Sequence, residues 1–278
     1  MLETQITQAK NYIEEADAIL ITAGAGMGVD SGLPDFRGKE GFWKAYPVIK
    51  DLDLSFEEMA NPKWFATNPA LAWAFYGHRL NLYRDTIPHE GFKMLLDLVE
   101  RKNNDYFIFT SNVDGQFQKA GFSQEKIVEV HGSIHHFQCH QNCQKEIWEA
   151  DTKKIEIDVD KFQALNFPQC KHCDSIARPN ILMFGDWSWQ GERSDAQEDR
   201  FYEWMKSIKE TNKKLAIIEI GAGTAIPTIR NSGERFAKKN KNMKLIRINP
   251  RDFHINQYLG FSIPFGGLEG ISKVLNTY

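Results

Sequence analysis

Residues 19–38 read ILITAGAGMGVDSGLPDFRG, an apolar run followed by a glycine-rich turn. The apolar part is typical of a buried strand in a parallel sheet. Glycine lets a backbone turn sharply and approach a ligand without a Cβ in the way, and a helix that begins at such a turn suits a phosphate. Gly24-Ala25-Gly26 matches only part of a dinucleotide-binding motif, because the third glycine is displaced, so alone it also fits a plain turn.

Further strands are predicted along the chain, each followed by polar or glycine residues. Apolar runs at 105–110, 127–130, 214–220 and 245–248 alternate with helical segments, which favours a doubly wound parallel α/β sheet. Ligands of such sheets bind beyond the carboxyl ends of the strands. The residues expected at those ends are Ser111, Asn112, Asp114, His131, Gly221, Ala222, Gly223 and Asn249.

The composition is that of an ordinary globular protein, with 278 residues, 42% of them hydrophobic and 26% charged. The formal net charge of -3 gives no reason to expect nucleic acid or an anionic membrane as a partner. No apolar stretch approaches the roughly 20 residues of a membrane helix, and the first residues lack the pattern of a signal peptide. We therefore expect a cytoplasmic protein, in which cysteines are more often metal ligands than disulfides.

The four cysteines form two close pairs, Cys139-x3-Cys143 and Cys170-x2-Cys173. Two such pairs separated by a longer segment suit a tetrahedral zinc site, which four thiolates close to water and substrate. Four histidines offer alternative ligands, although we expect each of them at the surface: His135, His136, His140 and His172. The sequence therefore predicts a structural zinc ion that takes no part in chemistry.

With these motifs in one order, the sequence resembles the sirtuin family. Residues 24–38 look like its cofactor-binding loop, and TSNVDG at 110–115 is similar to its nicotinamide-pocket motif. Val130-His131-Gly132 resembles the segment of its catalytic histidine, and RPNILMFGD at 178–186 resembles its substrate-binding segment. The match covers nearly the whole chain.

The resemblance implies a Rossmann-like NAD-binding domain that carries two insertions. The domain would comprise residues 1–41, 88–135 and 178–278. The insertions would be a helical segment at 42–87, rich in aromatic residues, and a four-cysteine zinc module at 136–177.

The implied reaction is NAD-dependent removal of an acyl group from a protein lysine, with transfer of that group to ADP-ribose and release of nicotinamide. His131 would be the general base, because an imidazole has an unperturbed pKa of about 6.5. Asn112 and Asp114 would shape the nicotinamide pocket as further catalytic residues. The other implied cofactor contacts are Gly24, Ala25, Gly26, Asp35, Phe36, Arg37, Ser111, Gly221, Ala222, Gly223 and Asn249. Met183, Phe184, Gly185 and Asp186 would bind the acyl-lysine substrate.

The sequence departs from the family pattern at four places. Gly28 stands where serine is usual, Ser111 where glutamine is usual, and Gly221-Ala222-Gly223 where a GTS-like turn is usual. These changes shorten hydrogen-bonding side chains and leave turnover and NAD affinity open. Asp186 replaces the glutamate of an FGE motif and is followed by Trp187-Ser188-Trp189, which alters the acyl-lysine cleft.

Tyr76 and Arg79 resemble the Tyr-x-x-Arg pair of sirtuins that prefer acidic acyl groups. Residues at i and i+3 share one helix face, and an arginine fork with a tyrosine hydroxyl suits a carboxylate. The pair therefore suggests removal of succinyl or malonyl groups in preference to acetyl. The alternative is a tyrosine in the core and an arginine in a surface ion pair.

Two other functions fit the same motifs. The pocket also suits NAD hydrolysis or ADP-ribosyl transfer, in which water or a protein group accepts the ribose, although His131 favours deacylation. A non-catalytic NAD-sensing module is the second alternative. We expect acyl-lysine proteins or peptides as partners, and the sequence leaves the oligomeric state open.

Overall fold

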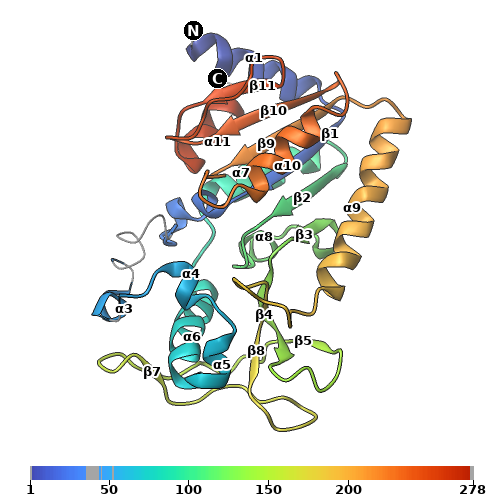
Figure 1. The fold of residues 1–278 in the computed structure, drawn as a ribbon. Coiled ribbons are helices and arrows are strands. Elements are labelled where there is room, and N and C mark those ends of the chain that lie inside the picture. The colour runs from blue at the N-terminus through green and yellow to red at the C-terminus, as the bar shows by residue number, and fades with distance from the viewer. Residues whose placement is uncertain (1, 36–43, 45, 52, 276–278) are drawn as a thin grey trace.

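The computed structural model describes residues 2–35, 44, 46–51 and 53–275 (Figure 1). The predictions for Phe36 and Arg37 lie outside the described residues. The main body is a six-stranded sheet of strand order β11-β10-β9-β1-β2-β3, with every neighbouring pair parallel. Its strands are β1 (Ala18–Ala23), β2 (Tyr106–Thr110), β3 (Ile127–Glu129), β9 (Leu215–Ile220), β10 (Met243–Ile248) and β11 (Gly260–Ile263). The predicted doubly wound α/β fold is therefore confirmed.

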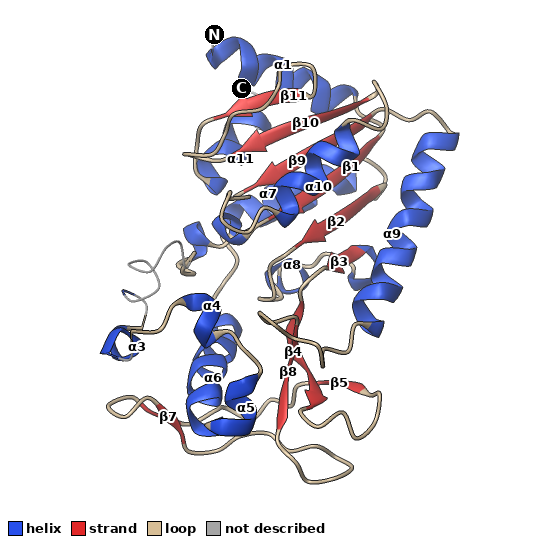
Figure 2. Cartoon of the chain, viewed as in Figure 1, coloured by secondary structure: helices blue, strands red, loops and turns tan. Residues whose placement is uncertain are grey.

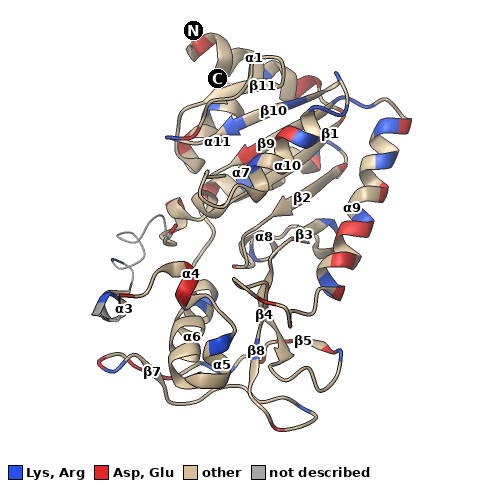
Figure 3. Cartoon of the chain, viewed as in Figure 1, with Lys and Arg blue, Asp and Glu red and all other residues tan. Residues whose placement is uncertain are grey.

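Helices cover both faces of this sheet (Figure 2). Successive residues of a strand point to opposite faces, so Ile19 and Ile21 pack against one layer and Leu20 against the other. The first layer contains α1 (Leu2–Glu15), α7 (Glu90–Arg101) and α11 (Gly267–Leu275), and the second contains α9 (Glu192–Glu210) and α10 (Thr228–Ala237). Figure 3 shows charged residues of both signs along α9, which buries only a narrow face.

A second body is built from the two predicted insertions, which share one hydrophobic core. Its helices are α3 (Pro47–Asp51), α4 (Phe56–Met59), α5 (Lys63–Thr67) and α6 (Pro69–Asp85). Its strands are β4 (Gly132–Cys139), β5 (Ile147–Glu149), β6 (Ile157–Asp158), β7 (Gln163–Ala164) and β8 (Ala177–Ile181). The sheet β5-β4-β8 thus begins before residue 136 and ends after residue 177. Buried Trp73 joins the two insertions, because its indole N–H donates to the Ala177 carbonyl at 3.0 Å.

The remaining described helices are short. They are the 3-10 turns η1 (Ala25–Met27), η2 (Val29–Ser31) and η3 (Gln124–Lys126), and the single-turn helix α8 (Gln116–Lys119). Among the described residues, no helix has the length and apolar character needed to cross a membrane.

A buried ion pair ties the centre of the sheet to α10. Arg247 of β10 lies opposite Glu219 of β9, donates to its carboxylate, and also donates to Glu234 of α10 at 3.0 Å. The side chains of Arg247 and Glu219 are almost fully buried, and burial raises the pKa of Glu219 to about 7. Removing one partner of such a pair leaves the other charge buried without compensation.

We expect Arg247→Met to lower the free energy of unfolding by about 3–5 kcal/mol in urea denaturation. The deficit should grow as the pH rises, because Arg247 lowers the pKa of Glu219 and its loss raises that pKa further, so the variant loses more stability than the wild type as the pH increases. Lys273→Met is the matched control, since the exposed Lys273–Glu269 pair at 3.8 Å should contribute less than about 0.5 kcal/mol. Equal losses in the two variants would show that the buried pair has no special role.

Candidate functional site

Two glycine loops contact each other where the strand order reverses, between β1 and β9. Gly26 N–H donates to the Gly221 carbonyl at 3.1 Å. A Cβ on Gly221 would lie 2.3 Å from the Gly26 carbonyl carbon, and its φ of 65° also favours glycine. A Cβ on Gly24 would lie 2.8 Å from the Gly221 oxygen. These loops therefore require glycine at Gly24 and Gly221.

The chain after Gly24 forms 3-10 turns rather than an α-helix. The turn η1 covers three residues and is followed by η2. Closely spaced glycines disfavour a long helix here, so the aligned dipole of such a helix plays no part. An anion would meet backbone N–H groups of a short turn instead.

The end of β2 is attached to the glycine loop by Asn112. Its side-chain N–H donates to the Gly24 carbonyl at 3.0 Å, and its backbone N–H donates to Thr110 Oγ1 at 3.0 Å. Ser111 directly precedes it and donates its backbone N–H to the Ala23 carbonyl. The predicted residues at the ends of β1 and β2 therefore lie side by side.

Asp114 lies half-buried in the same loop. One of its carboxylate oxygens accepts the Gln116 N–H at 2.9 Å, and burial raises the pKa of the Asp114 carboxyl to about 6. His135 also holds the loop, since its Nε2 lies 2.9 Å from the Asp114 carbonyl oxygen. We expected His135 at the surface, whereas it is half-buried, and a Cβ on Gly115 would lie 2.6 Å from its ring. The cue would have been its place on a strand two residues before buried Phe137.

His131 stands between the end of β3 and the start of β4. Its carbonyl accepts the Leu182 N–H at 3.0 Å, which places it beside the predicted substrate-binding segment. Gly132 permits this approach, because a Cβ there would lie 2.0 Å from the Asn180 oxygen. Burial lowers the pKa of His131, so its imidazole is neutral near pH 7. A neutral imidazole is the form that accepts a proton.

The segment from Met183 to Asp186 is held by a buried ion pair. Asp186 accepts from the Arg178 guanidinium and from the Met183 N–H, and both ion-pair side chains are fully buried. Phe184 contacts the helical insertion: its N–H donates to the Ala60 carbonyl at 3.0 Å. Met183 is buried, whereas Phe184 and Gly185 are exposed.

Tyr76 and Arg79 lie on one face of α6 and are 1% and 7% exposed. Arg79 Nε donates to the Tyr83 hydroxyl at 3.0 Å, and the guanidinium lies 5.3 Å from the Phe75 ring centroid. The alternative of a surface ion pair is therefore wrong, although Tyr76 does lie in the core as that alternative required. The arginine is a buried cation among aromatic rings.

Residues predicted for the adenosine side lie at the ends of β9 and β10. Asn249 is fully buried, and its side-chain N–H donates to the Ala222 carbonyl at 2.9 Å. Its Oδ1 accepts the Arg251 N–H at 3.0 Å. Arg251 in turn lies 3.5 Å from the Asp35 carboxylate. Gly223 follows Ala222 in the same loop, while the alternative pairing of Asp35 with Arg37 lies outside the described residues.

The four cysteine sulfurs lie within 4.8 Å of one another. The Cys139–Cys173 and Cys143–Cys170 sulfurs are 3.7 Å and 3.5 Å apart. Tetrahedral zinc with Zn–S bonds of about 2.3 Å places its sulfurs about 3.8 Å apart, so the donor set fits this metal. Among the described residues, no histidine joins the cluster.

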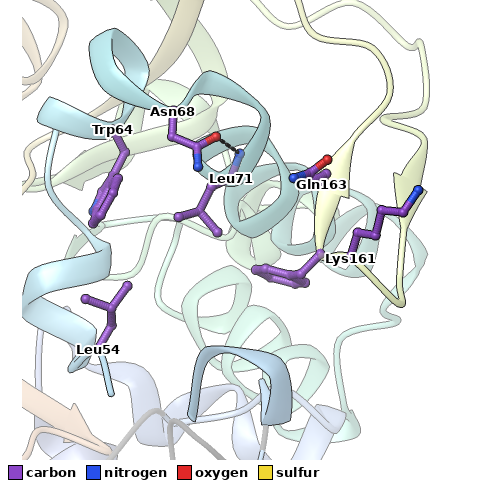
Figure 4. Close-up of a pocket in the computed structure, with 7 residues that line it drawn as sticks. Leu54, Trp64, Asn68, Leu71, Lys161 and Gln163 are labelled. Atoms are coloured by element: carbon purple, nitrogen blue, oxygen red, sulfur yellow. Dashed lines mark hydrogen bonds between the residues drawn. The ribbon is translucent and has the colours of Figure 1, made fainter. Parts of the chain in front are cut away.

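A cavity of about 350 Å³ lies elsewhere, within the second body (Figure 4). Its lining residues are Leu54, Trp64, Asn68, Leu71, Lys161, Phe162 and Gln163. The Asn68 side chain already accepts the Leu71 N–H as the cap of α6. These lining residues include none of the predicted site residues that the structure describes.

Comparisons with known proteins identify the family. The model of the Sir2 family matches residues 24–227. A protein of Aquifex aeolicus named NAD-dependent protein deacylase is 30% identical over 92% of this chain and 93% of its own length. A protein of the same name from Thermus thermophilus is 24% identical over 98% of this chain and 94% of its own length.

Solved structures share the fold. A Sir2 homologue–NAD complex superposes with a TM-score of 0.67 at 22% identity, covering 97% of this chain and 92% of the other. A second structure, titled as the structural basis for the mechanism and regulation of Sir2 enzymes, superposes with a TM-score of 0.68 at 20% identity. The match covers 98% of this chain and 97% of the other.

We predict that the purified protein carries one zinc ion per chain. Cys143→Ser should remove the ion, because three thiolates no longer close the tetrahedral shell. His172→Ala is the control and should keep it, although His172 lies next to the cluster and pairs with Glu146. Elemental analysis of both variants tests this. Loss of zinc in the histidine variant alone would contradict the four-cysteine assignment.

Proposed function

This chain belongs to the Sir2 family, and we propose that it removes acyl groups from protein lysines with NAD as co-substrate, preferring acidic acyl groups. The family is enzymatic, and relatives that match nearly the whole chain carry the name NAD-dependent protein deacylase. The chain is therefore an NAD-dependent protein deacylase. The observation that supports the proposed catalytic site is that Asn112 is bonded to the glycine loop at the end of β2, while His131 follows the neighbouring strand β3 and is bonded to Leu182.

The residues present fit NAD. The contact of Gly24 and Gly26 with Gly221 forms a cradle that a Cβ would fill, and a pyrophosphate suits such closely approached backbone. We assign Asn112 and Asp114 to the nicotinamide end, and Asn249 with the Gly221–Gly223 loop to the adenosine end. NAD supplies a ribose carbon that releases nicotinamide and takes the oxygen of the acyl group.

His131 is proposed as the general base. It is mostly buried and neutral near pH 7, so it accepts a proton without first losing one. Its backbone bond to Leu182 keeps it next to the segment assigned to acyl-lysine. This placement favours deacylation over the alternative in which water alone receives the ribose.

We also propose that the chain divides as the motifs suggest. The NAD-binding domain would comprise residues 1–41, 88–135 and 178–278, with the insertions at 42–87 and 136–177. Separate hydrophobic cores for the sheet and for the two insertions support the division into two bodies. Strands β4 and β8 cross the boundaries at 135/136 and 177/178, so Ile134 and Ile181 pack in the core of the insertions.

The acyl preference rests on Arg79 and Tyr76. The Arg79 guanidinium lies beside the rings of Phe75 and Tyr76, and a guanidinium forms strong ionic hydrogen bonds with a carboxylate. Burial raises the pKa of Tyr76 to about 12, so its hydroxyl remains a donor at neutral pH. Both groups therefore suit an acyl chain that ends in a carboxylate.

We expect faster turnover of a succinyl-lysine peptide than of the same peptide with acetyl-lysine. Arg79→Met should lower kcat/KM for the succinyl peptide about tenfold to a hundredfold, the effect of one lost charge-assisted hydrogen bond, and spare the acetyl peptide. Arg84→Met is the control on the same helix, because Arg84 donates to the Lys153 carbonyl at an exposed position. Mass analysis should identify O-acyl-ADP-ribose as product. Faster acetyl turnover by the wild type would refute the preference, and ADP-ribose formed equally without peptide would refute deacylation.

The pH profile tests the role of His131. A base with a lowered pKa is already neutral above about 6.5, so kcat should be flat from about pH 7 to 8 and fall as the pH drops through the folded pKa. His131→Ala should lose activity and still bind NAD in calorimetry. A rate that rises steadily between about pH 7 and 8 would exclude a base with lowered pKa.

A further inference from the structure

A side chain of the zinc module contacts the chain just after the segment assigned to substrate. Asn142 lies between Cys139 and Cys143 and has a left-handed φ of 50°. Its side-chain N–H donates to the Ser188 carbonyl at 2.9 Å. Its Oδ1 accepts from Gln138 at 3.1 Å and from Gln190 at 3.0 Å. Asn142 is thus bonded to two other amides and to the chain just after Asp186.

These residues belong to an amide cluster, which we define as Gln138, Asn142, Asn180 and Gln190. Asn180 donates to Gln138 Oε1 at 3.0 Å, and Gln138 donates to the Ser188 carbonyl at 2.9 Å. Gln138 and Asn180 are fully buried and Gln190 nearly so. Removing the hydrogen-bond partner of a buried amide lowers the stability of the folded protein. Linked hydrogen bonds also strengthen one another, so this cluster has one favoured arrangement.

Ser188 connects the amide cluster to the substrate segment through hydrogen bonds. Its N–H and its hydroxyl both donate to Asp186 Oδ1 at 3.1 Å. The other oxygen of Asp186 accepts the Met183 N–H at 3.3 Å. A continuous set of hydrogen bonds therefore joins the metal-binding turn, Ser188, Asp186 and Met183.

We propose that Asn142 is a positioning residue through which the cysteine turn 139–143 sets the geometry of the acyl-lysine segment. The inference rests on the proposed function, because it takes 182–186 as the segment that binds the acylated substrate. The metal module then contributes to the affinity for the acyl-lysine substrate without touching it. The affinity for NAD, which is assigned to the glycine loops, does not depend on this module.

The test is Asn142→Gly. Glycine accepts the positive φ at no cost, so the turn keeps its backbone while the amide is lost. The variant loses all three side-chain hydrogen bonds of Asn142, of which the one to the Ser188 carbonyl reaches the chain that leads to the substrate segment. We expect KM for an acyl-lysine peptide to rise about tenfold, the effect of that one bond, while zinc content and KM for NAD stay within about twofold. Gln141→Gly is the control in the same turn, since Gln141 is exposed and lies outside the amide cluster.

Three results would overturn the inference: an unchanged KM for the peptide, an equal rise in both KM values, or loss of zinc from Asn142→Gly. The last would show that Asn142 holds the turn itself rather than the substrate segment. Hydrogen exchange of residues 182–188 gives a readout independent of activity and should accelerate in Asn142→Gly. If the wild type deacylates no peptide, the proposed function fails, whereas faster exchange in the variant would still support the link.

Discussion

The contact of backbone on backbone between the Gly24–Gly26 turn and Gly221 is the constraint on which the site depends. The parallel strands β1 and β9 lie about 4.8 Å apart, and their outgoing loops need not touch. Here they do, because no Cβ stands between them. Asn112 then bonds to the Gly24 carbonyl, so the end of β2 takes its position from the same turn. A side chain at Gly221 would displace Gly26 and, through Gly24, Asn112 as well.

Much of the fold follows from the sequence because the strands of a parallel sheet are buried on both faces. The predicted strand at 214–220 corresponds to β9 (Leu215–Ile220), every residue of which is buried. Helix α9 has no comparable pattern, because it is strongly polar and buries only a narrow face, including Phe201 and Met205. Strand β4 was not predicted because it starts at Gly132 directly after His131, and its pairing partner β8 lies far along the chain, beyond the cysteine module.

The site was predictable where its residues follow strands, and unpredictable where contacts join distant parts of the chain. The ends of parallel strands share one edge, so placing Asn112 or Asn249 there required only the strand assignments. The hydrogen bonds from His135 to Asp114 and from Asn142 to Ser188 span 21 and 46 residues. No local pattern distinguishes these two side chains from surface residues. Their roles emerge only once β4 and β8 are paired and the cysteine turn is closed.

Two bodies with separate cores meet at the site, and this explains how one chain handles two ligands. The residues assigned to NAD belong to the sheet edge, and the side chains assigned to the acyl group, Tyr76 and Arg79, belong to the core of the insertions. The acyl-lysine segment is bonded to both bodies: Leu182 to His131 on one side, and Phe184 to Ala60 on the other. A change within the insertions can reach this segment through the Ala60–Phe184 bond, whereas the contact between Gly24, Gly26 and Gly221 lies within the loops of the sheet.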